Sequence, residues 1–223
     1  SFSILYFWVM NEDHTNSRRE FKSGSLSDQH ILQDPLAMFA AWLNEAANKQ
    51  ILEANAMTLS TVNDKGEPSS RVVLLRGIDE RGFTFYTNYN SQKSKQIGHN
   101  NKVALNFFWP LLERQVRING IINKISDSEA DAYFASRPRE SQIGAWASPQ
   151  SEVIESKRAL IEKFADIESK AANGQIPRPK FWGGLIVVPH YYEFWQGGEH
   201  RLHDRYQYEL QIDKKWKISR LAP

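Results

Sequence analysis

Residues 56–88 read "AMTLSTVNDKGEPSSRVVLLRGIDERGFTFYTN" and contain three runs rich in β-branched and aromatic residues. The segments between the runs, "NDKGEP" and "DERG", carry the Gly, Pro, Asn and Asp that favour turns. No helical pattern separates the three runs. Strands that follow one another without helices favour an antiparallel meander or barrel.

The segments further along the chain extend the β pattern. Residues 102–126, "KVALNFFWPLLERQVRINGIINKIS", predict two or three more strands, and the last two or three strands end at "RLAP", residues 220–223. No internal repeat or linker divides the chain. We therefore expect one domain over residues 17–223, preceded by an N-terminal extension at residues 1–16.

Three segments predict helices around this barrel. Residues 34–49 have Asp34 as N-cap and proline at the first helical position. Residues 126–138, "SDSEADAYFASRP", begin with a capping box and end at a proline, and residues 151–172 form a longer amphipathic pattern. The expected fold is mainly β, an antiparallel, Greek-key-like β-barrel with peripheral helices.

The composition excludes several classes of protein. Lys and Arg number 28 against 26 Asp and Glu, a balance that disfavours a nucleic-acid binder acting through bulk charge. Cysteine is absent, which excludes disulfides and thiolate metal sites and suits a cytoplasmic protein. The apolar residues 1–10 are too short to span a bilayer, so we expect no membrane anchor and place a natural start at Met10.

Familiar catalytic motifs are missing as well. No HExxH, GxSxG, GxGxxG or Walker-type spacing occurs, and the 6 histidines are scattered. This disfavours serine hydrolases, zinc enzymes and Rossmann or P-loop nucleotide sites, and we expect no metal site.

Two segments could each bind an anion. Arg71 opens the strand "RVVLLR", where a guanidinium offers paired donors to phosphate or carboxylate, although a strand-edge arginine is often structural. Tyr86 and Thr87 end a strand just before Ser91 and Lys93, and hydroxyls beside a helix N-terminus and a lysine can bind phosphate.

Further polar residues could complete a second site. Tyr133 and Arg137 share one helix face, and Ser141 follows past a proline, so the three could hold another anion or form a surface stack. Gln115 lies in a strand, where it could satisfy a backbone group or read the polar edge of a planar ring.

The segment "FWQGGEHRLHDRYQYEL", residues 194–210, concentrates charge in a strand-like pattern. Arg201, His203 and Arg205 would share one strand face, where they repel unless an anion lies between them. An exposed charged strand is the alternative. Together these groups suit a phosphorylated, planar cofactor and a second anionic ligand.

The segments "RVVLLRG", "FYTN", "ERQVRINGI", "YFASRPRESQIGAWASPQS", "PKFWGG", "FWQGGEHRLHDR" and "RLAP" resemble the pyridoxamine/pyridoxine 5'-phosphate oxidases in order and spacing. The resemblance covers residues 17–223. It implies an FMN-binding split β-barrel and a homodimer with FMN at the subunit interface. It also implies oxidation of pyridoxamine and pyridoxine 5'-phosphate to pyridoxal 5'-phosphate, with dioxygen as acceptor and hydrogen peroxide released.

The resemblance also implies roles toward FMN. Arg71 and Lys93 would hold its phosphate beside Tyr86 and Thr87, and Gln115 would contact the ring. Four residues would be contributed across the interface: Gln150, Ser151, Trp195 and Arg205. The remaining expected FMN contacts are Val72, Val73, Leu74, Leu75, Arg76 and Gln92.

Toward the substrate, the resemblance assigns the phosphate to Tyr133, Arg137 and Ser141. Arg201 and His203 would lie over the pyridine ring as catalytic residues, with His203 a candidate for polarising the substrate or shuttling a proton. The other expected substrate contacts are Arg18, Arg76 and Leu202.

The chain departs from the family pattern at three positions. Arg76 stands where the family usually has lysine, which changes reach and fork geometry. Gln92 replaces an arginine and brings no charge to the FMN phosphate, and Phe21 replaces a frequent tyrosine.

Two other functions remain open from the sequence. Another split-barrel flavin reductase or oxidoreductase would share the FMN groups but should lack the Tyr133, Arg137 and Ser141 set. A non-enzymatic carrier of FMN or pyridoxal phosphate would bind without turnover.

Overall fold

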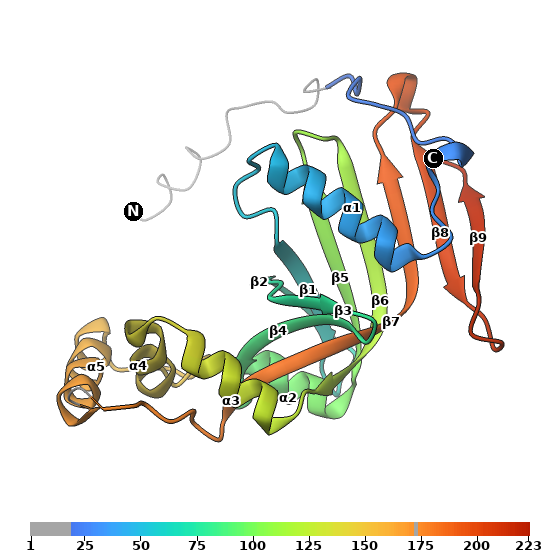
Figure 1. Cartoon of the computed structure of the whole chain (residues 1–223). Coiled ribbons are helices and arrows are strands. Elements are labelled where there is room, and N and C mark those ends of the chain that lie inside the picture. The colour runs from blue at the N-terminus through green and yellow to red at the C-terminus, as the bar shows by residue number, and fades with distance from the viewer. Residues whose placement is uncertain (1–18, 172–173) are drawn as a thin grey trace, which may run out of the picture.

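The structure, a computed structural model, describes residues 19–171 and 174–223. The expected extension at residues 1–16 and the candidate Arg18 lie outside the described residues. Within them, nine strands form one antiparallel sheet, and five α-helices surround it (Figure 1). None of the helices in this part of the chain is long and apolar enough to cross a membrane.

The sheet curls into a half-barrel, as the sequence predicted. Its strand order is β2-β1-β5-β6-β7-β4-β3, with β8 pairing to β7 and β9 to β8. The strands are β1 Ala56–Val62, β2 Pro68–Leu74, β3 Gly77–Asp79, β4 Gly82–Asn88, β5 Lys102–Trp109, β6 Arg114–Lys124, β7 Trp182–Gln196, β8 Asp204–Leu210 and β9 Trp216–Leu221.

Strand β7 joins the two halves of the sheet. Its first residues pair with β4 and its last residues with β8, while β6 follows it along most of its length. The register with β6 shifts between Asn119 and Gly120. A Cβ atom at Gly120 would lie 2.6 Å from the Val188 carbonyl oxygen, so only glycine allows the strands to cross this closely.

The second β-rich run of the sequence becomes two strands. The chain turns between β2 and β3, where the Arg76 amide donates to the Thr84 carbonyl at 2.8 Å. Leu75 points into the core at this turn, with 5% of its surface exposed.

Local signals place most of the helices. In α1 (Pro35–Asn48) the Asp34 carboxylate accepts from the Leu36 amide at 3.0 Å, which confirms the predicted N-cap. Helix α2 is Gln92–His99, and α3 (Asp127–Ser136) begins with the predicted capping box of Ser126 and Glu129.

Two helices differ from the prediction. Helix α4 (Arg139–Ala147) was not expected, because Pro138 was interpreted only as a stop. In the structure Pro138 is also the N-cap of the next helix, where its missing N–H leaves no intrahelical bond unmade. Helix α5 begins at Lys157 rather than at Ser151 and is described to Ala171.

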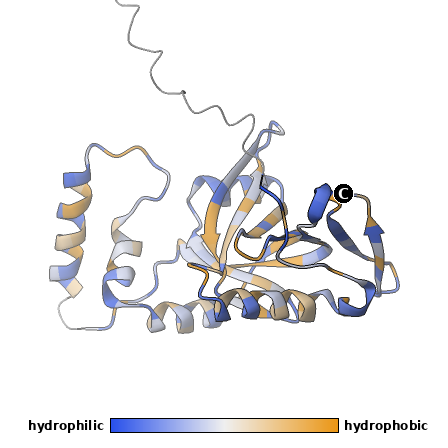
Figure 2. Cartoon of the chain, turned by 90° about the horizontal axis from the view of Figure 1, so that it is seen from above, coloured by the Kyte–Doolittle hydropathy of each residue, from blue (hydrophilic) through white to orange (hydrophobic). Residues whose placement is uncertain are grey.

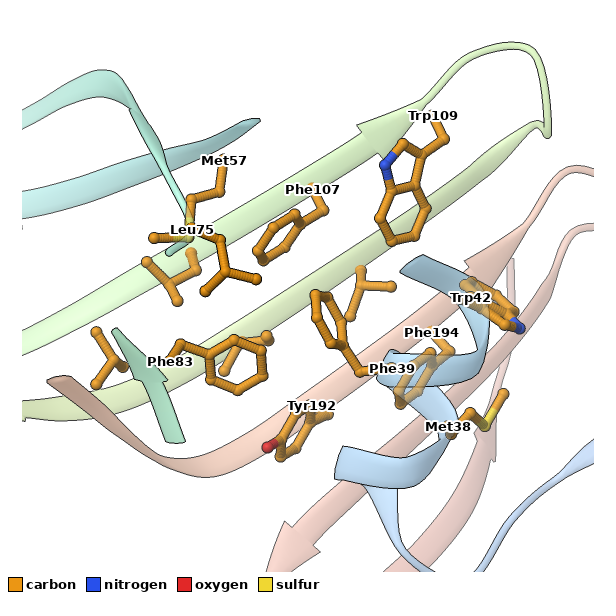
Figure 3. Close-up of a cluster of buried hydrophobic side chains, with 14 of the residues drawn as sticks. Met38, Phe39, Trp42, Met57, Leu75, Phe83, Phe107, Trp109, Tyr192 and Phe194 are labelled. Carbon is orange, nitrogen blue, oxygen red and sulfur yellow. The ribbon is translucent and has the colours of Figure 1, made fainter. Parts of the chain in front are cut away.

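The main core lies between α1 and the concave sheet (Figure 3). Phe39 of α1 packs edge-on against Phe83 and Phe107, with ring centroids 4.9 and 4.7 Å away. A second, smaller core joins α3 and α4 to the start of β7. Helices α4 and α5 lie at one end of the molecule and the C-terminal strands at the other (Figure 2).

Candidate active site

A cavity of about 650 Å³ opens between β2, the end of β4, the start of α2 and the end of α3. We call it the cationic cavity, because Arg71, Arg76, Lys93 and Arg137 all line it. Nine other predicted residues also line it: Val72, Val73, Leu74, Tyr86, Thr87, Gln92, Tyr133, Gln150 and Ser151.

Arg71 is held at the cavity wall by neutral acceptors. Its Nη1 donates to the Leu59 carbonyl at 3.2 Å, the Thr61 hydroxyl at 2.6 Å and the Ser69 carbonyl at 3.1 Å. Its Nη2 donates to the Gln96 side-chain oxygen at 3.3 Å. Burial lowers the pKa of Arg71.

Lys93 meets the same cavity from the first turn of α2. Its Nζ donates to the Thr87 hydroxyl at 3.1 Å, the Ser91 hydroxyl at 3.3 Å and the Gln150 side-chain oxygen at 3.1 Å. Burial, and secondarily the charge of Arg71, lower the pKa of Lys93 to about 8. An anion placed between these cations would offset both the cost of burying the Lys93 charge and its repulsion from Arg71.

No carboxylate within the described residues forms an ion pair with any of the four cations of the cavity. The ion pairs of this part of the chain involve other basic side chains, such as those of Arg81, Arg114 and Arg178. The positive charge of the cavity is therefore left for a ligand to neutralise.

Arg137 and Tyr133 line the cavity from the end of α3. The ring of Tyr133 stacks on Tyr86, with centroids 3.6 Å apart. The Arg137 guanidinium lies 4.5 Å from the ring centroid of Trp182, and its Nη1 is buried with no hydrogen-bond partner among the described residues. Such an unmet donor is costly unless a ligand satisfies it.

Two predicted residues belong to segments next to this cavity but do not line it. Leu75 does not line it, because its side chain is in the main core. Ser141 lies in α4 and is not among the lining residues either, although it follows Arg137 closely in the sequence.

A second group of predicted residues lies on β6, β7 and β8, and we call it the β6–β8 cluster. Gln115, Trp195 and Arg205 are direct neighbours across the three strands. The Arg205 Nε donates to Glu193 at 3.0 Å, and Glu193 also pairs with Arg117 at 3.0 Å. Glu193 is buried, and its ion pair with Arg205 fixes the direction of the Arg205 side chain.

His203 completes this cluster from the β7–β8 connection. Its Nδ1 accepts from the Gly198 amide at 3.1 Å, and its ring lies 4.8 Å from that of Trp195. Phe21 packs edge-on against both rings. Burial, and secondarily the charge of Arg201, lower the pKa of His203.

The expected alternating strand through Arg201, His203 and Arg205 is wrong. Residues Glu199–Arg201 form a 3-10 turn, and β8 begins only at Asp204. His200 and Arg201 have positive φ, which no strand allows. The carboxylate beside Arg205 in this chain is Glu193, which the sequence did not indicate.

The cationic cavity and the β6–β8 cluster lie at opposite ends of one chain. Figure 1 shows α3 and α4 at one end of the molecule and the β7–β8 connection at the other. The expectation that Gln150 and Ser151 come from across an interface is wrong for this chain. Both line the same cavity as Arg71 and Lys93, because residues 150 and 151 follow α4 back to the end of β4.

Comparison with known proteins now identifies the family. Residues 43–171 match the family described as pyridoxamine 5'-phosphate oxidase. Residues 182–223 match the pyridoxine 5'-phosphate oxidase C-terminal dimerisation region. The chain belongs to the pyridoxamine 5'-phosphate oxidase family. Its members are oxidoreductases, and so is this enzyme.

Curated members of this oxidase family resemble the chain along nearly its whole length. A pyridoxine/pyridoxamine 5'-phosphate oxidase of Rippkaea orientalis is 52% identical over 206 residues, covering 92% of this chain and 97% of that protein. One from Cytophaga hutchinsonii is 49% identical and covers 96% of this chain and 100% of its own length.

Solved structures agree with the split-barrel fold. PhzG from Burkholderia lata, solved with tetrahydrophenazine-1-carboxylic acid, superposes with a TM-score of 0.83 at 28% identity, covering 89% of this chain and 98% of that one. An FMN-binding protein from Nostoc punctiforme superposes with a TM-score of 0.70 at 18% identity, covering 86% and 100%.

Sequence reasoning about this oxidase missed three residues of the site. Gln96 accepts from both Arg71 and Thr61, Glu193 orients Arg205, and Trp182 lines the cationic cavity. Only Trp182 left a signal, because the resembling segment "PKFWGG" contains it.

Proposed function

We propose that this oxidase uses FMN to convert pyridoxamine and pyridoxine 5'-phosphate to pyridoxal 5'-phosphate. The observation that carries the proposal is the cationic cavity, whose four cations have no carboxylate partner among the described residues. Cations from β2 and α2 and a further cation at the end of α3 fit two phosphate groups, one of the cofactor and one of the substrate. The names of the curated relatives support the same substrates.

The residues of the cavity fit FMN. Arg71, Lys93 and Thr87 would hold its phosphate, beside the N-terminus of α2. The exposed Val72 of β2 offers an apolar surface to a planar ring. When bound, FMN supplies the two-electron redox chemistry, with dioxygen as final acceptor and hydrogen peroxide as product.

The chain's own residues would bind and orient the substrate. Arg137 and Tyr133 would hold its phosphate. His203 accepts a backbone N–H at Nδ1, so its neutral form carries the ring proton on Nε2 and can donate to a substrate oxygen. The lowered pKa of His203 favours that neutral form. Such positioning is the main contribution of a protein to cofactor chemistry.

The overall reaction balances with these reactants. Pyridoxine 5'-phosphate and dioxygen give pyridoxal 5'-phosphate and hydrogen peroxide. Pyridoxamine 5'-phosphate also consumes one water and releases ammonia.

We further propose that the enzyme is a homodimer that shares FMN between subunits. Gln115, Trp195 and Arg205 do not line the cavity of their own chain. Trp195 and Arg205 fall within the matched dimerisation region, residues 182–223. A two-fold partner would bring these residues to the cavity of the first chain.

Purification and an oxygen assay test the function. The protein is expected to be yellow and to consume oxygen and release peroxide with pyridoxamine 5'-phosphate, and to turn over pyridoxamine without phosphate far more slowly. A yellow protein without turnover would indicate a flavin carrier. Equal turnover of pyridoxamine 5'-phosphate and pyridoxamine would indicate a different split-barrel oxidoreductase.

Lys93 makes FMN affinity depend on pH. Its pKa of about 8 in the flavin-free protein should rise when a phosphate dianion binds beside it. FMN binding then takes up a proton, so affinity should fall as pH rises from 7 to 9. Fluorescence titration of the apoprotein measures this slope. Lys93→Arg stays charged and should flatten it, whereas a flat profile in the unmodified enzyme would contradict the assignment.

The residues of the β7–β8 segment should separate into two classes. Arg201→Ala and His203→Ala are expected to impair turnover while the protein stays yellow. Arg205→Ala should instead yield apoprotein that added FMN partly rescues. Flavin absorbance and steady-state kinetics for the three variants distinguish these classes. An exposed charged surface would give changes in stability of only about 0.5 kcal/mol and unchanged kinetics.

A further inference from the structure

Trp182 begins β7 within the segment "FWGG", residues 181–184, and it has no place in the function proposed so far. It is buried, yet it also lines the cationic cavity. Its ring is nearly parallel to those of Tyr86 and Tyr133, with interplanar angles of 14° and 3°. The three rings therefore form one stack that joins β7 and β4 to α3.

Arg137 rests on this stack. Its guanidinium lies 4.5 Å from the Trp182 centroid and 5.6 Å from that of Phe134. No carboxylate in the described part of the chain pairs with it, and its Nη1 has no hydrogen-bond partner there. An aromatic face attracts a cation without accepting conventional hydrogen bonds from its N–H groups, so it does not compete with a phosphate for those donors. A carboxylate in the same place would compete with that phosphate.

Backbone hydrogen bonds fix the position of Trp182 in this stack. The Trp182 carbonyl accepts from Arg178 Nη1 at 2.7 Å, and its amide donates to the Pro179 carbonyl at 3.0 Å. A Cβ at Gly184 would lie 2.2 Å from the Ile125 side chain and 3.0 Å from Tyr86. Glycine at position 184, two residues after Trp182, thus leaves the space that the Ile125 side chain and the Tyr86 ring occupy.

We propose that Trp182 is a positioning residue that holds Arg137 for the substrate phosphate and so sets the preference for phosphorylated over unphosphorylated substrates. The inference rests on the proposed function, in which Arg137 binds that phosphate. Trp182 acts through Arg137 and not through the flavin.

The test compares Trp182→Leu and Trp182→Phe in the flavin-loaded enzyme. In Trp182→Leu, the ratio of kcat/KM for pyridoxamine 5'-phosphate to that for pyridoxamine should fall roughly tenfold, between the sizes of an exposed and a fully desolvated cation–π contact. The fall should come from KM for the phosphorylated substrate, with kcat and bound flavin retained. Trp182→Phe keeps a ring and should lose less of the ratio.

Trp146→Leu is the matched control. Trp146 packs against the same small core and donates to the Pro177 carbonyl at 2.8 Å, but it does not line the cavity. Its loss should lower thermal stability and leave the substrate ratio unchanged.

A double variant isolates the coupling. With Arg137 already replaced by alanine, Trp182→Leu should change the ratio no further, because its effect passes through the guanidinium. An unchanged ratio in the folded Trp182 variants, or additive effects in the double variant, would overturn the inference. If Trp182→Leu fails to fold, the ratio of kcat/KM for the phosphorylated to the unphosphorylated substrate in Trp182→Phe tests the inference alone. If Arg137→Ala itself leaves KM unchanged, the proposed phosphate site fails instead.

Discussion

Arg71→Ala is expected to purify as a colourless apoprotein. Its guanidinium would make charge-assisted bonds to the FMN phosphate, and losing them should cost about 3 kcal/mol, or on the order of 100-fold in affinity. The substitution also removes the Arg71 donor from the Thr61 hydroxyl and from the Gln96 side-chain oxygen, although Gln96 still accepts from Thr61. The ratio of flavin to protein absorbance measures retention, and titration of the apoprotein measures affinity.

Arg158→Ala is the control for this loss. Arg158 is an exposed arginine of α5 whose ion pair among the described residues is with Glu162, one turn along the same helix. Its replacement should leave the protein yellow and almost equally stable. Arg71→Ala that keeps stoichiometric flavin would move the phosphate site away from β2.

Arg137→Ala should raise KM for pyridoxamine 5'-phosphate by roughly 30-fold, which corresponds to about 2 kcal/mol for one charge-assisted phosphate contact. The bound flavin should remain, because Arg71 and Lys93 belong to β2 and α2 and, among the described residues, make no side-chain hydrogen bond with Arg137. Steady-state kinetics with both substrates, beside flavin absorbance, measures the effect.

Arg139→Ala serves as its neighbour control. Arg139 is two residues away, but it donates to the Gly174 carbonyl and lines a different hollow. Its KM should stay within about twofold of the unmodified enzyme. Loss of flavin from Arg137→Ala, or an unchanged KM, would give Arg137 a structural role.

Local chemistry made much of the fold predictable. The Asp34 cap, the Ser126 and Glu129 capping box and the turn segments around β2 each act within a few residues, so the sequence alone indicates them. The β-rich runs likewise predicted the sheet. Helix α4 was not predicted, because Pro138 can both end one helix and begin another.

The rest of the site depended on contacts between distant segments. The sequence indicated Arg71 and Lys93 as two separate anion-binding candidates, and only the resemblance to a family assigned both to one phosphate site. Glu193 and Trp182 acquire their roles only through β8 and α3. The loop at His200 and Arg201 was mistaken for a strand, because side-chain alternation does not reveal positive φ.

The separation of the cationic cavity from the β6–β8 cluster has a genetic consequence. In the proposed homodimer, Arg71 of one subunit and Arg205 of the other serve the same flavin, although one gene encodes both. Two alleles, one defective at each arginine, would each be inactive alone. When expressed together they would form mixed dimers, in which one site receives both defects and the other receives none. Two alleles of this enzyme would therefore complement one another within one dimer when one alters the cationic cavity and the other alters the β6–β8 cluster.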